Sequence, residues 1–314
     1  MITDKCCGTP TNRIMISVAT AVCAVIGVMS ASHFESPQTT PSPAKVVQAN
    51  DDKAQPHEDL DAVLWIQTSA EYGAIARQTF RAAWAAVGDA LVNSKWTAST
   101  EQQQMVAEGK GEDWLKSLPP AVVMDVDETV LDNSRFQVGL IESGGEYSRE
   151  GWKAFVNKKV STPIPGAVEF VNALRVAGVT PIFVTNREHE VEPATRENLI
   201  AVGLMKKSDP DLVFTKYEKE EWTSNKQTRR AALASQYRIL LLLGDDLNDF
   251  IETEYHSSSE VRRQTADQYK HWFGERWFVL PNPNYGGWEQ ALYEWENAVS
   301  AQTKRKRKRE KMKR

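Results

Sequence analysis

Short apolar runs alternate with helical patterns from residue 121 onward in this 314-residue chain. Five continuous apolar runs are bounded by polar or turn residues: 121–124, 180–184, 212–214, 239–243 and 277–280. Four segments with helical spacing of apolar residues separate them: 166–177, 193–203, 225–236 and 261–273. Continuous apolar runs are typical of strands covered on both faces. Their alternation with helices predicts an α/β fold with a doubly wound parallel sheet.

One long amphipathic helix is predicted before the first strand. Between residues 64 and 91, apolar or small side chains recur every three or four positions, and Trp65 and Phe80 widen this stripe. Such a stripe indicates a helix that packs on the core. We therefore expect folding to begin near Leu60, with one domain over residues 60–300.

The N-terminal segment has the features of a targeting sequence. Residues 14–31 are 18 positions without a charge, and Lys5 and Arg13 precede them. Residues 1–32 therefore resemble a secretory signal peptide, which predicts export to the periplasm, the outer membrane or the cell surface. The run also reaches the lower length limit of a membrane span, so an uncleaved anchor with membrane association is an alternative. Lipidation at Cys23 is the third alternative.

Polar or charged segments flank the domain on both sides. Residues 33–59 contain four prolines and little apolar content, so we interpret them as a linker. Residues 304–314 carry nine Lys or Arg and one Glu, a charge of +8, which leaves −12 on the other 303 residues of a chain of net charge −4. We expect residues 301–314 to be a disordered basic tail. Contact with anionic lipid, surface polysaccharide or nucleic acid is the alternative role.

Composition excludes several classes of protein. With 41% hydrophobic and 25% charged residues, the chain is not disordered overall, not collagen-like and not a polytopic membrane protein. The acidic body argues against nucleic-acid binding by the domain. All three cysteines lie in the first 23 residues, so the domain has no disulfide, thiolate metal site or cysteine nucleophile.

Acidic residues follow the first and fourth apolar runs. Asp125 and Asp127 come directly after the first run, and residues two apart in an extended segment point the same way. Asp245 and Asp249 follow the fourth run, and the carboxyl ends of parallel strands form the ligand-binding edge of such a sheet. Clustered carboxylates need a compensating cation, and their oxygen atoms suit Mg²⁺. The sequence has no set of His and Cys residues with the spacing of a zinc site, so zinc is not favoured.

This arrangement suits phosphoryl transfer. An aspartate can attack phosphorus to form an aspartyl-phosphate, while a second aspartate moves the proton. Thr185 and Asn186 follow the second apolar run and can donate hydrogen bonds to phosphate oxygens. Lys226 can offset the phosphate charge. The roles of two further residues stay open. Arg187 either pairs with an acidic residue or contacts the substrate, and Asn133 either caps a turn or belongs to the site.

Four segments resemble the four motifs of the haloacid dehalogenase superfamily: 124–130, 184–187, Lys226 and 244–249. The details are similar to its class C branch, the bacterial nonspecific acid phosphatases, which are exported enzymes that include lipoprotein nucleotidases. Similarity extends to Trp65 and to residues 165–170 and 280–289, and covers roughly 62–298. The resemblance implies a haloacid dehalogenase-like Rossmannoid core with an added N-terminal helical segment and a small cap insertion.

The resemblance also implies a role for each motif residue. Asp125 would be the nucleophile and Asp127 the acid/base. The protein ligands of Mg²⁺ would be Asp125, the backbone carbonyl of Asp127, and Asp245. Thr185 and Lys226 would bind the transferring phosphate.

Substrate recognition in the family involves aromatic side chains. Members that cleave nucleoside monophosphates sandwich the base between aromatic rings, and Tyr147 and Tyr285 match those positions. Asp249 is implied to position Lys226 or a water on the metal. Asp246 departs from the family pattern, because Asn or Thr usually occupies that position, and it adds a negative charge beside the metal.

The combined expectation is an exported, Mg²⁺-dependent acid phosphatase that hydrolyses phosphomonoesters, foremost nucleoside 5'-monophosphates. One alternative keeps the chemistry and changes the substrate to a sugar phosphate or a surface phosphomonoester. Another is a non-catalytic surface binding protein on the same fold. The oligomeric state is left undecided.

Overall fold

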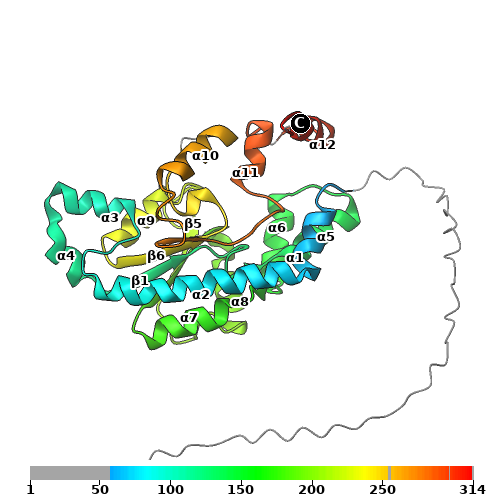
Figure 1. Cartoon of the computed structure of the whole chain (residues 1–314). Helices are drawn as coiled ribbons and strands as arrows, with labels where there is room; N and C mark the ends of the chain where they lie inside the picture. The colour runs from blue at the N-terminus through cyan, green and yellow to red at the C-terminus, as the bar shows by residue number, and fades with distance from the viewer. Residues whose placement is uncertain (1–56, 254–255, 297, 313–314) are drawn as a thin grey trace, which may run out of the picture. The chain divides into compact units, whose positions relative to one another are not determined.

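The computed structural model describes residues 57–253, 256–296 and 298–312, which belong to one compact unit. Its centre is a five-stranded sheet in the order β5-β4-β1-β6-β7, with every neighbouring pair parallel (Figure 1). The strands are β1 (Pro120–Met124), β4 (Thr180–Glu188), β5 (Val213–Lys216), β6 (Arg238–Gly244) and β7 (Trp277–Val279). Each apolar run of the sequence became one of these strands, so the predicted doubly wound α/β fold is confirmed.

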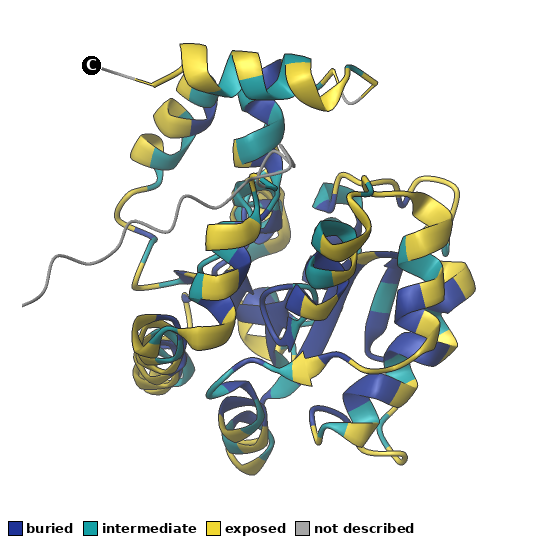
Figure 2. Ribbon diagram, turned by 90° about the vertical axis from the view of Figure 1, so that its right-hand side faces the viewer, coloured by how far each residue is buried: buried dark blue, intermediate teal, exposed yellow. Residues whose placement is uncertain are grey.

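Helices cover both faces of the sheet, which explains its unbroken apolar runs. Every residue of β6 is buried, including four consecutive leucines. In Figure 1 one layer lies below the sheet and comprises α2 (Ala70–Val92), α7 (Ala167–Val176) and α8 (Glu192–Ala201). The layer above comprises α9 (Gln227–Ala234) and α10 (Ser259–Gln268). Figure 2 shows dark blue strands between helices whose outer faces are exposed.

The predicted N-terminal helix is two helices, which corrects the expectation of a single one. α1 (Leu60–Thr68) and α2 are separated by Ser69, whose backbone is extended at φ −78° and ψ 141°. The Ser69 hydroxyl accepts a hydrogen bond from the Tyr72 N–H at 3.1 Å, so it caps the start of α2. The apolar stripe continues across the break, and periodicity alone therefore did not reveal it.

Three helical segments between α2 and β1 had no clear sequence signal: α3 (Thr100–Met105), the π-helical turn η1 (Val106–Lys110) and α4 (Gly111–Ser117). Buried Gln102 connects this region to the sheet, because its side chain accepts from the Ile239 N–H at 3.0 Å and donates to the Ala234 carbonyl at 2.9 Å. The short 3-10 turns are η2 (His189–Val191), η3 (Leu247–Asp249) and η4 (Ala291–Tyr293).

A small insertion between β1 and β4 forms the expected cap. It contains β2 (Leu131–Asp132), α5 (Ser134–Ser143), α6 (Arg149–Asn157) and β3 (Thr162–Pro163). β2 and β3 pair antiparallel at its base. Phe136 of α5 packs against Trp152 and Phe155 of α6, with ring centroids 5.0 and 5.4 Å apart. This aromatic contact joins the two cap helices.

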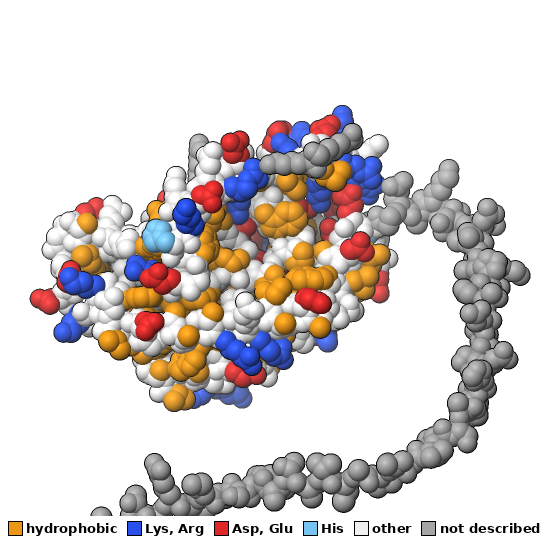
Figure 3. Space-filling view, in the orientation of Figure 1, with side chains coloured by type: hydrophobic (Ala, Val, Ile, Leu, Met, Phe, Trp, Pro, Cys, Tyr) orange, Lys and Arg blue, Asp and Glu red, His pale blue; other side chains and the backbone are white. Residues whose placement is uncertain are grey.

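The basic C-terminal segment is helical over residues 301–310, which differs from the expectation of a disordered tail at 301–314. Residues Ala301–Glu310 form α12, which follows the short helix α11 (Gly287–Gln290). Arg305 Nε lies 2.8 Å from Glu58 Oε1, and Lys308 Nζ lies 3.7 Å from Glu58 Oε2. Basic and acidic side chains mingle over this region in Figure 3. The acidic body thus supplies partners for the basic segment, which the composition of the segment alone does not show.

The predicted signal or anchor at residues 1–32 and nearly all of the linker at 33–59 lie outside the described residues. Within the described ranges, no helix is both long enough and apolar enough to span a membrane.

Candidate active site

Three carboxylates meet at the carboxyl ends of two neighbouring strands. Asp125 follows β1, while Asp245 and Asp249 follow β6, which pairs with β1. One carboxylate oxygen from each residue lies within 4.8 Å of the other two. Asp125 and Asp249 are 7% and 8% exposed, so the cluster is largely withdrawn from water. The structure therefore brings together three of the side chains that the strand-end pattern indicated.

Lys226, the residue before α9, lies between two of these carboxylates. Its Nζ donates to Asp125 Oδ1 and, at 2.6 Å, to Asp249 Oδ1. The second oxygen of Asp249 accepts hydrogen bonds from the backbone N–H groups of Asp245 and Asp246, at 3.1 and 2.9 Å. Asp249 thus fixes the position of Lys226, which is one of the two roles that the resemblance implied.

The Asp127 carboxylate contacts Arg187. Arg187 is fully buried, and its Nε and Nη2 lie 2.9 and 2.8 Å from Asp127 Oδ1. Asn133 Nδ2 donates to the same oxygen at 2.8 Å. Of the two roles left open for Arg187, the structure shows the pairing with an acid, and it makes Asn133 part of the same group. These two donors hold the Asp127 side chain in one orientation.

Two polar residues of β4 have different partners. Thr185 is fully buried, and its hydroxyl donates to Asp127 Oδ2 at 3.4 Å. Asn186 is exposed; its amide accepts from Arg229 Nη2 at 2.6 Å and donates to the Ser224 carbonyl at 3.0 Å. Successive strand residues point to opposite sides, so only one of the two can face the cluster. In this structure the Asn186 amide is held by Arg229 and Ser224, and phosphate binding by Asn186 beside Thr185 stays a prediction.

The two tyrosines expected around the substrate lie on different elements. Tyr285, in the loop after β7, donates from its hydroxyl to Glu128 Oε2. Glu128 is 1% exposed and has left-handed backbone, φ 57°. Tyr147 lies in the cap before α6, is 63% exposed and meets Phe136 edge-on with ring centroids 6.2 Å apart. Tyr285 thus reaches the buried acids, whereas Tyr147 offers its ring to solvent.

Comparison with known proteins identifies the family. A model of the HAD superfamily, subfamily IIIB acid phosphatases, matches residues 46–288. The chain belongs to this family. The class C acid phosphatase from Bacillus anthracis is similar in structure, with 29% identity, a TM-score of 0.68, and coverage of 82% of this chain and 97% of that chain. A structure of the Bacillus anthracis enzyme with tungstate bound gives 28% identity, a TM-score of 0.67 and the same coverage.

Acid phosphatases of this family hydrolyse phosphomonoesters, so the predicted enzyme class is confirmed. The alternative of a non-catalytic binding protein is not supported. The expected resemblance to the haloacid dehalogenase superfamily and its class C branch is confirmed as well. A small phosphomonoester is the substrate class, and the carboxylates at the ends of β1 and β6 form the site where its chemistry is expected.

The acidic cluster of the phosphatase is short of positive charge. Burial raises the pKa of Asp125 to about 7; the charges of Asp249 and Asp127 add to this rise, and Lys226 opposes it. Burial, with the charges of Asp249 and Asp125, also raises the pKa of Asp245 well above its usual range. Burial lowers the pKa of Lys226, but the adjacent Asp125 and Asp249 raise it more, so the lysine stays protonated.

A divalent cation fits this charge imbalance. One ammonium does not balance three carboxylates, and the available ligand atoms are carboxylate oxygens, which hard cations prefer. The Thr129 hydroxyl and the Asn282 amide donate to Asp245 Oδ1 and Oδ2, at 3.2 and 2.8 Å, and so hold this carboxylate in place. Enzymes of the superfamily typically use a divalent metal, and the carboxylates at the ends of β1 and β6 supply oxygen atoms of the kind that such a metal binds.

Sequence reasoning missed two residues that contact the site. Glu128 was overlooked because strand alternation directs it away from Asp127, but the chain turns into the left-handed region at Glu128. Asn282 follows the fifth apolar run, as Asp125 follows the first, and that signal was available. Its hydrogen bond to Asp245 shows that the polar residue after the edge strand β7 also faces the site.

Proposed function

We propose that this phosphatase is an exported, Mg²⁺-dependent enzyme that hydrolyses nucleoside 5'-monophosphates through an aspartyl-phosphate intermediate. The observation that carries the proposal is the position of Asp125 at the end of the central strand β1. It lies in contact with Lys226 and within a group of three carboxylates. A carboxylate so placed is a nucleophile with positive charge at hand for an incoming phosphate.

The first step forms the intermediate. An Asp125 carboxylate oxygen attacks phosphorus, the bond from phosphorus to the ester oxygen breaks, and the Asp127 carboxyl gives its proton to the departing oxygen. Arg187 and Asn133 hold Asp127 in the orientation that this transfer requires. Mg²⁺, when bound by Asp125, Asp245 and the backbone carbonyl of Asp127, supplies positive charge that reduces the repulsion between carboxylate and phosphate.

The second step releases phosphate. Asp127, now a carboxylate, takes a proton from a water molecule whose oxygen attacks phosphorus, and the bond between phosphorus and Asp125 breaks. Inorganic phosphate leaves, and both aspartates return to their starting states. We assign to Lys226 the balance of the phosphate charge and to Thr185 a hydrogen bond to a phosphate oxygen as the group is transferred.

The nucleotide preference is supported by Tyr285. Its hydroxyl is anchored on Glu128 at the site, and we assign its partly exposed ring as the platform on which a flat base stacks. Tyr147 presents a second exposed ring on the cap. Bound tungstate in the similar Bacillus anthracis enzyme is consistent with an oxyanion site in this fold.

Export is supported by residues 1–32, which combine a basic start with an uncharged run. We propose a location in the periplasm, at the outer membrane or on the cell surface, with a cleaved signal as the leading form. Cell fractionation and the mass of the mature protein test this. A full-mass protein in the cytosol would contradict export, and a lipid-modified protein whose mass corresponds to a chain that begins at Cys23 would show attachment there.

A substrate panel tests the activity. Protein lacking residues 1–32 is assayed with p-nitrophenyl phosphate, adenosine monophosphate and glucose 6-phosphate at acid to neutral pH, with Mg²⁺ or with EDTA. We expect EDTA to abolish turnover, Mg²⁺ to restore it, and adenosine monophosphate to have the highest kcat/KM. Higher kcat/KM for glucose 6-phosphate would move the preference to sugar phosphates, and no metal-dependent turnover would overturn the proposal.

A further inference from the structure

The loop of residues 281–286, between β7 and α11, forms one side of the candidate active site. It contributes two contacts: the Asn282 amide donates to Asp245 Oδ2 at 2.8 Å, and the Tyr285 hydroxyl donates to Glu128. We call this segment the site loop. Because both contacts come from one short segment, the position of its backbone decides whether they form.

Asp246 holds the end of the site loop. Its Oδ2 accepts from the Gly287 N–H at 2.6 Å, and its Oδ1 accepts from the Asn248 N–H at 3.0 Å. Arg262 Nη2 lies 3.1 Å from each of the two oxygens. Arg262 is 7% exposed and comes from α10, so the pair joins the site loop to a helix of the sheet's outer layer.

The glycines at this junction allow backbone and ion pair to touch. A Cβ at Gly287 would lie 2.5 Å from Arg262 Nη1, which is closer than real contacts allow. A Cβ at Gly286 would lie 3.2 Å from Asp246 Oδ2, and Gly286 has φ 137°, a conformation that favours glycine. The loop therefore rests directly on the pair, without an intervening side chain.

We propose that Asp246 is a positioning residue, which with Arg262 fixes the site loop and thereby sets how the enzyme binds the leaving group of its substrate. Its negative charge is directed to Arg262 and two backbone N–H groups. The metal ligand Asp245, next to it in the chain, turns to different donors, Thr129 and Asn282. This inference rests on the proposed function in one respect: the substrate is a nucleotide, whose nucleoside leaving group is large enough to contact the site loop.

The chemistry of the side chain explains the need for a carboxylate. Both oxygens accept hydrogen bonds here, one from Gly287 and the other from Asn248. An asparagine has one acceptor oxygen, so its NH₂ group would face one of these N–H donors. Asp246→Asn therefore loses a charge-assisted hydrogen bond while it keeps the size of the side chain.

The test compares two substrates in the full-length Asp246→Asn protein. The large one is adenosine monophosphate, and the small one is methyl phosphate, whose leaving group is too short to meet the site loop. We expect KM for adenosine monophosphate to rise about tenfold, as for one lost charge-assisted hydrogen bond, with kcat changed less than about twofold. KM for methyl phosphate is expected to stay at its wild-type value. The Mg²⁺ concentration for half activation is expected to rise much less than KM for adenosine monophosphate, because Thr129 still holds Asp245 if Asn282 shifts.

Controls separate this role from two others. Asp211→Asn removes an exposed carboxylate that lies 3.7 Å from Arg196, and it should change neither KM. Arg262→Lys keeps the charge but loses the planar fork, so it should reproduce the selective rise in KM, and it serves as the second variant if Asp246→Asn does not fold. A shifted Mg²⁺ requirement with equal losses on both substrates would overturn the proposal, as would a lower Tm with unchanged KM values.

The wild-type enzyme separates this inference from the proposed function. If wild type shows no preference for adenosine monophosphate over methyl phosphate, the nucleotide preference fails. The Asp246→Asn comparison is then made with p-nitrophenyl phosphate as the large substrate, because its aromatic leaving group still reaches the loop. An unchanged KM for that substrate would overturn the positioning role.

Discussion

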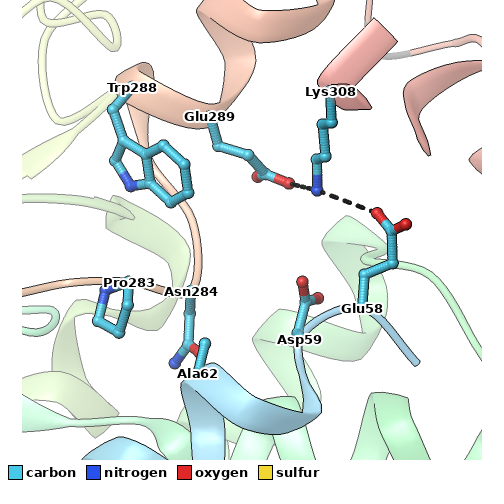
Figure 4. Close-up of a pocket in the computed structure, with 8 residues that line it drawn as sticks. All are labelled: Glu58, Asp59, Ala62, Pro283, Asn284, Trp288, Glu289 and Lys308. Carbon is cyan, nitrogen blue, oxygen red and sulfur yellow. Dashed lines mark ion pairs between the residues drawn. The ribbon is translucent and has the colours of Figure 1, made fainter. Parts of the chain in front are cut away.

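Two lysines of this protein lie between pairs of carboxylates, one inside the active site and one on the surface helix α12. Lys226 is 6% exposed and contacts Asp125 and Asp249. Lys308 is 24% exposed, and its Nζ lies 2.6 Å from Glu289 Oε1 and 3.7 Å from Glu58 Oε2. Dashed lines mark these two ion pairs in Figure 4. The contacts look alike, but water screens the second far more than the first.

This difference in burial separates a lysine that serves the reaction, Lys226, from a lysine that attaches a surface helix, Lys308. Burying an ion pair carries a large desolvation cost, so such a pair is weak evidence for stability and better evidence for function. Exposed pairs contribute little individually, and several together can hold a surface element in place. We therefore expect changes at the strand ends to remove activity, and changes in α12 to alter stability by small amounts.

The largest effect is expected for Asp125→Asn. The amide keeps the size of the side chain but is not a nucleophile, so turnover should fall below about a thousandth of the wild-type value. The measurement is p-nitrophenyl phosphate hydrolysis with saturating Mg²⁺. Asp113→Asn, in α4, is the control with wild-type activity. A variant that keeps substantial turnover would mean that another group attacks phosphorus.

The two lysines allow a direct comparison by the same substitution. Lys226→Met leaves Asp125 and Asp249 without their cation, so kcat/KM should fall at least about a hundredfold through lost charge on the phosphate. Removing one partner of a buried pair also costs about 3–5 kcal/mol of unfolding free energy. Lys308→Met should keep wild-type kcat/KM and lose less than about 1 kcal/mol.

Urea unfolding and steady-state kinetics measure both variants. Similar losses of unfolding free energy in the two proteins would contradict the distinction by burial. Unchanged kcat/KM in Lys226→Met would remove this lysine from the phosphate site.

The central part of the site could be predicted from sequence because the sheet itself assembles it. Asp125 ends one apolar run and Asp245 ends another, and the carboxyl ends of parallel strands share one edge. Lys226 is not at a strand end, so the strand-end pattern did not place it; its positive charge and the family resemblance suggested its role. The break at Ser69 was hidden because the apolar stripe continues through it.

Features that depend on distant partners could not be predicted. The buried position of Glu128 depends on a left-handed turn and on Tyr285, which is far away in the chain. The partners of the Asn186 amide, Arg229 and Ser224, lie about 40 residues further along the chain and could not be read from the strand-end pattern. The order of the C-terminal segment likewise depends on acids elsewhere, which its own repeated Lys and Arg do not reveal.

Removal of α12 is expected to change stability but not turnover. Its basic residues that face the body pair with acids, for example Arg307 with Glu296 at 2.9 Å and Arg305 with Glu58 at 2.8 Å. A protein that ends at residue 300 should lose about 1–3 kcal/mol of unfolding free energy, the sum of several partly exposed pairs. Its kcat on p-nitrophenyl phosphate should equal that of the full chain.

Salt and a matched pair of substitutions locate the source of this loss. In about 1 M salt the Debye length is about 3 Å, so the difference between full-length and shortened proteins should shrink. Replacing Arg305 and Lys308 by Ala should reproduce most of the loss, whereas replacing the outward-facing Lys306 and Lys311 should not. A loss that salt leaves unchanged would show that apolar packing, rather than charge pairing, attaches α12. The interpretation that exposed ion pairs such as that of Lys308 hold α12 on the body would then be wrong.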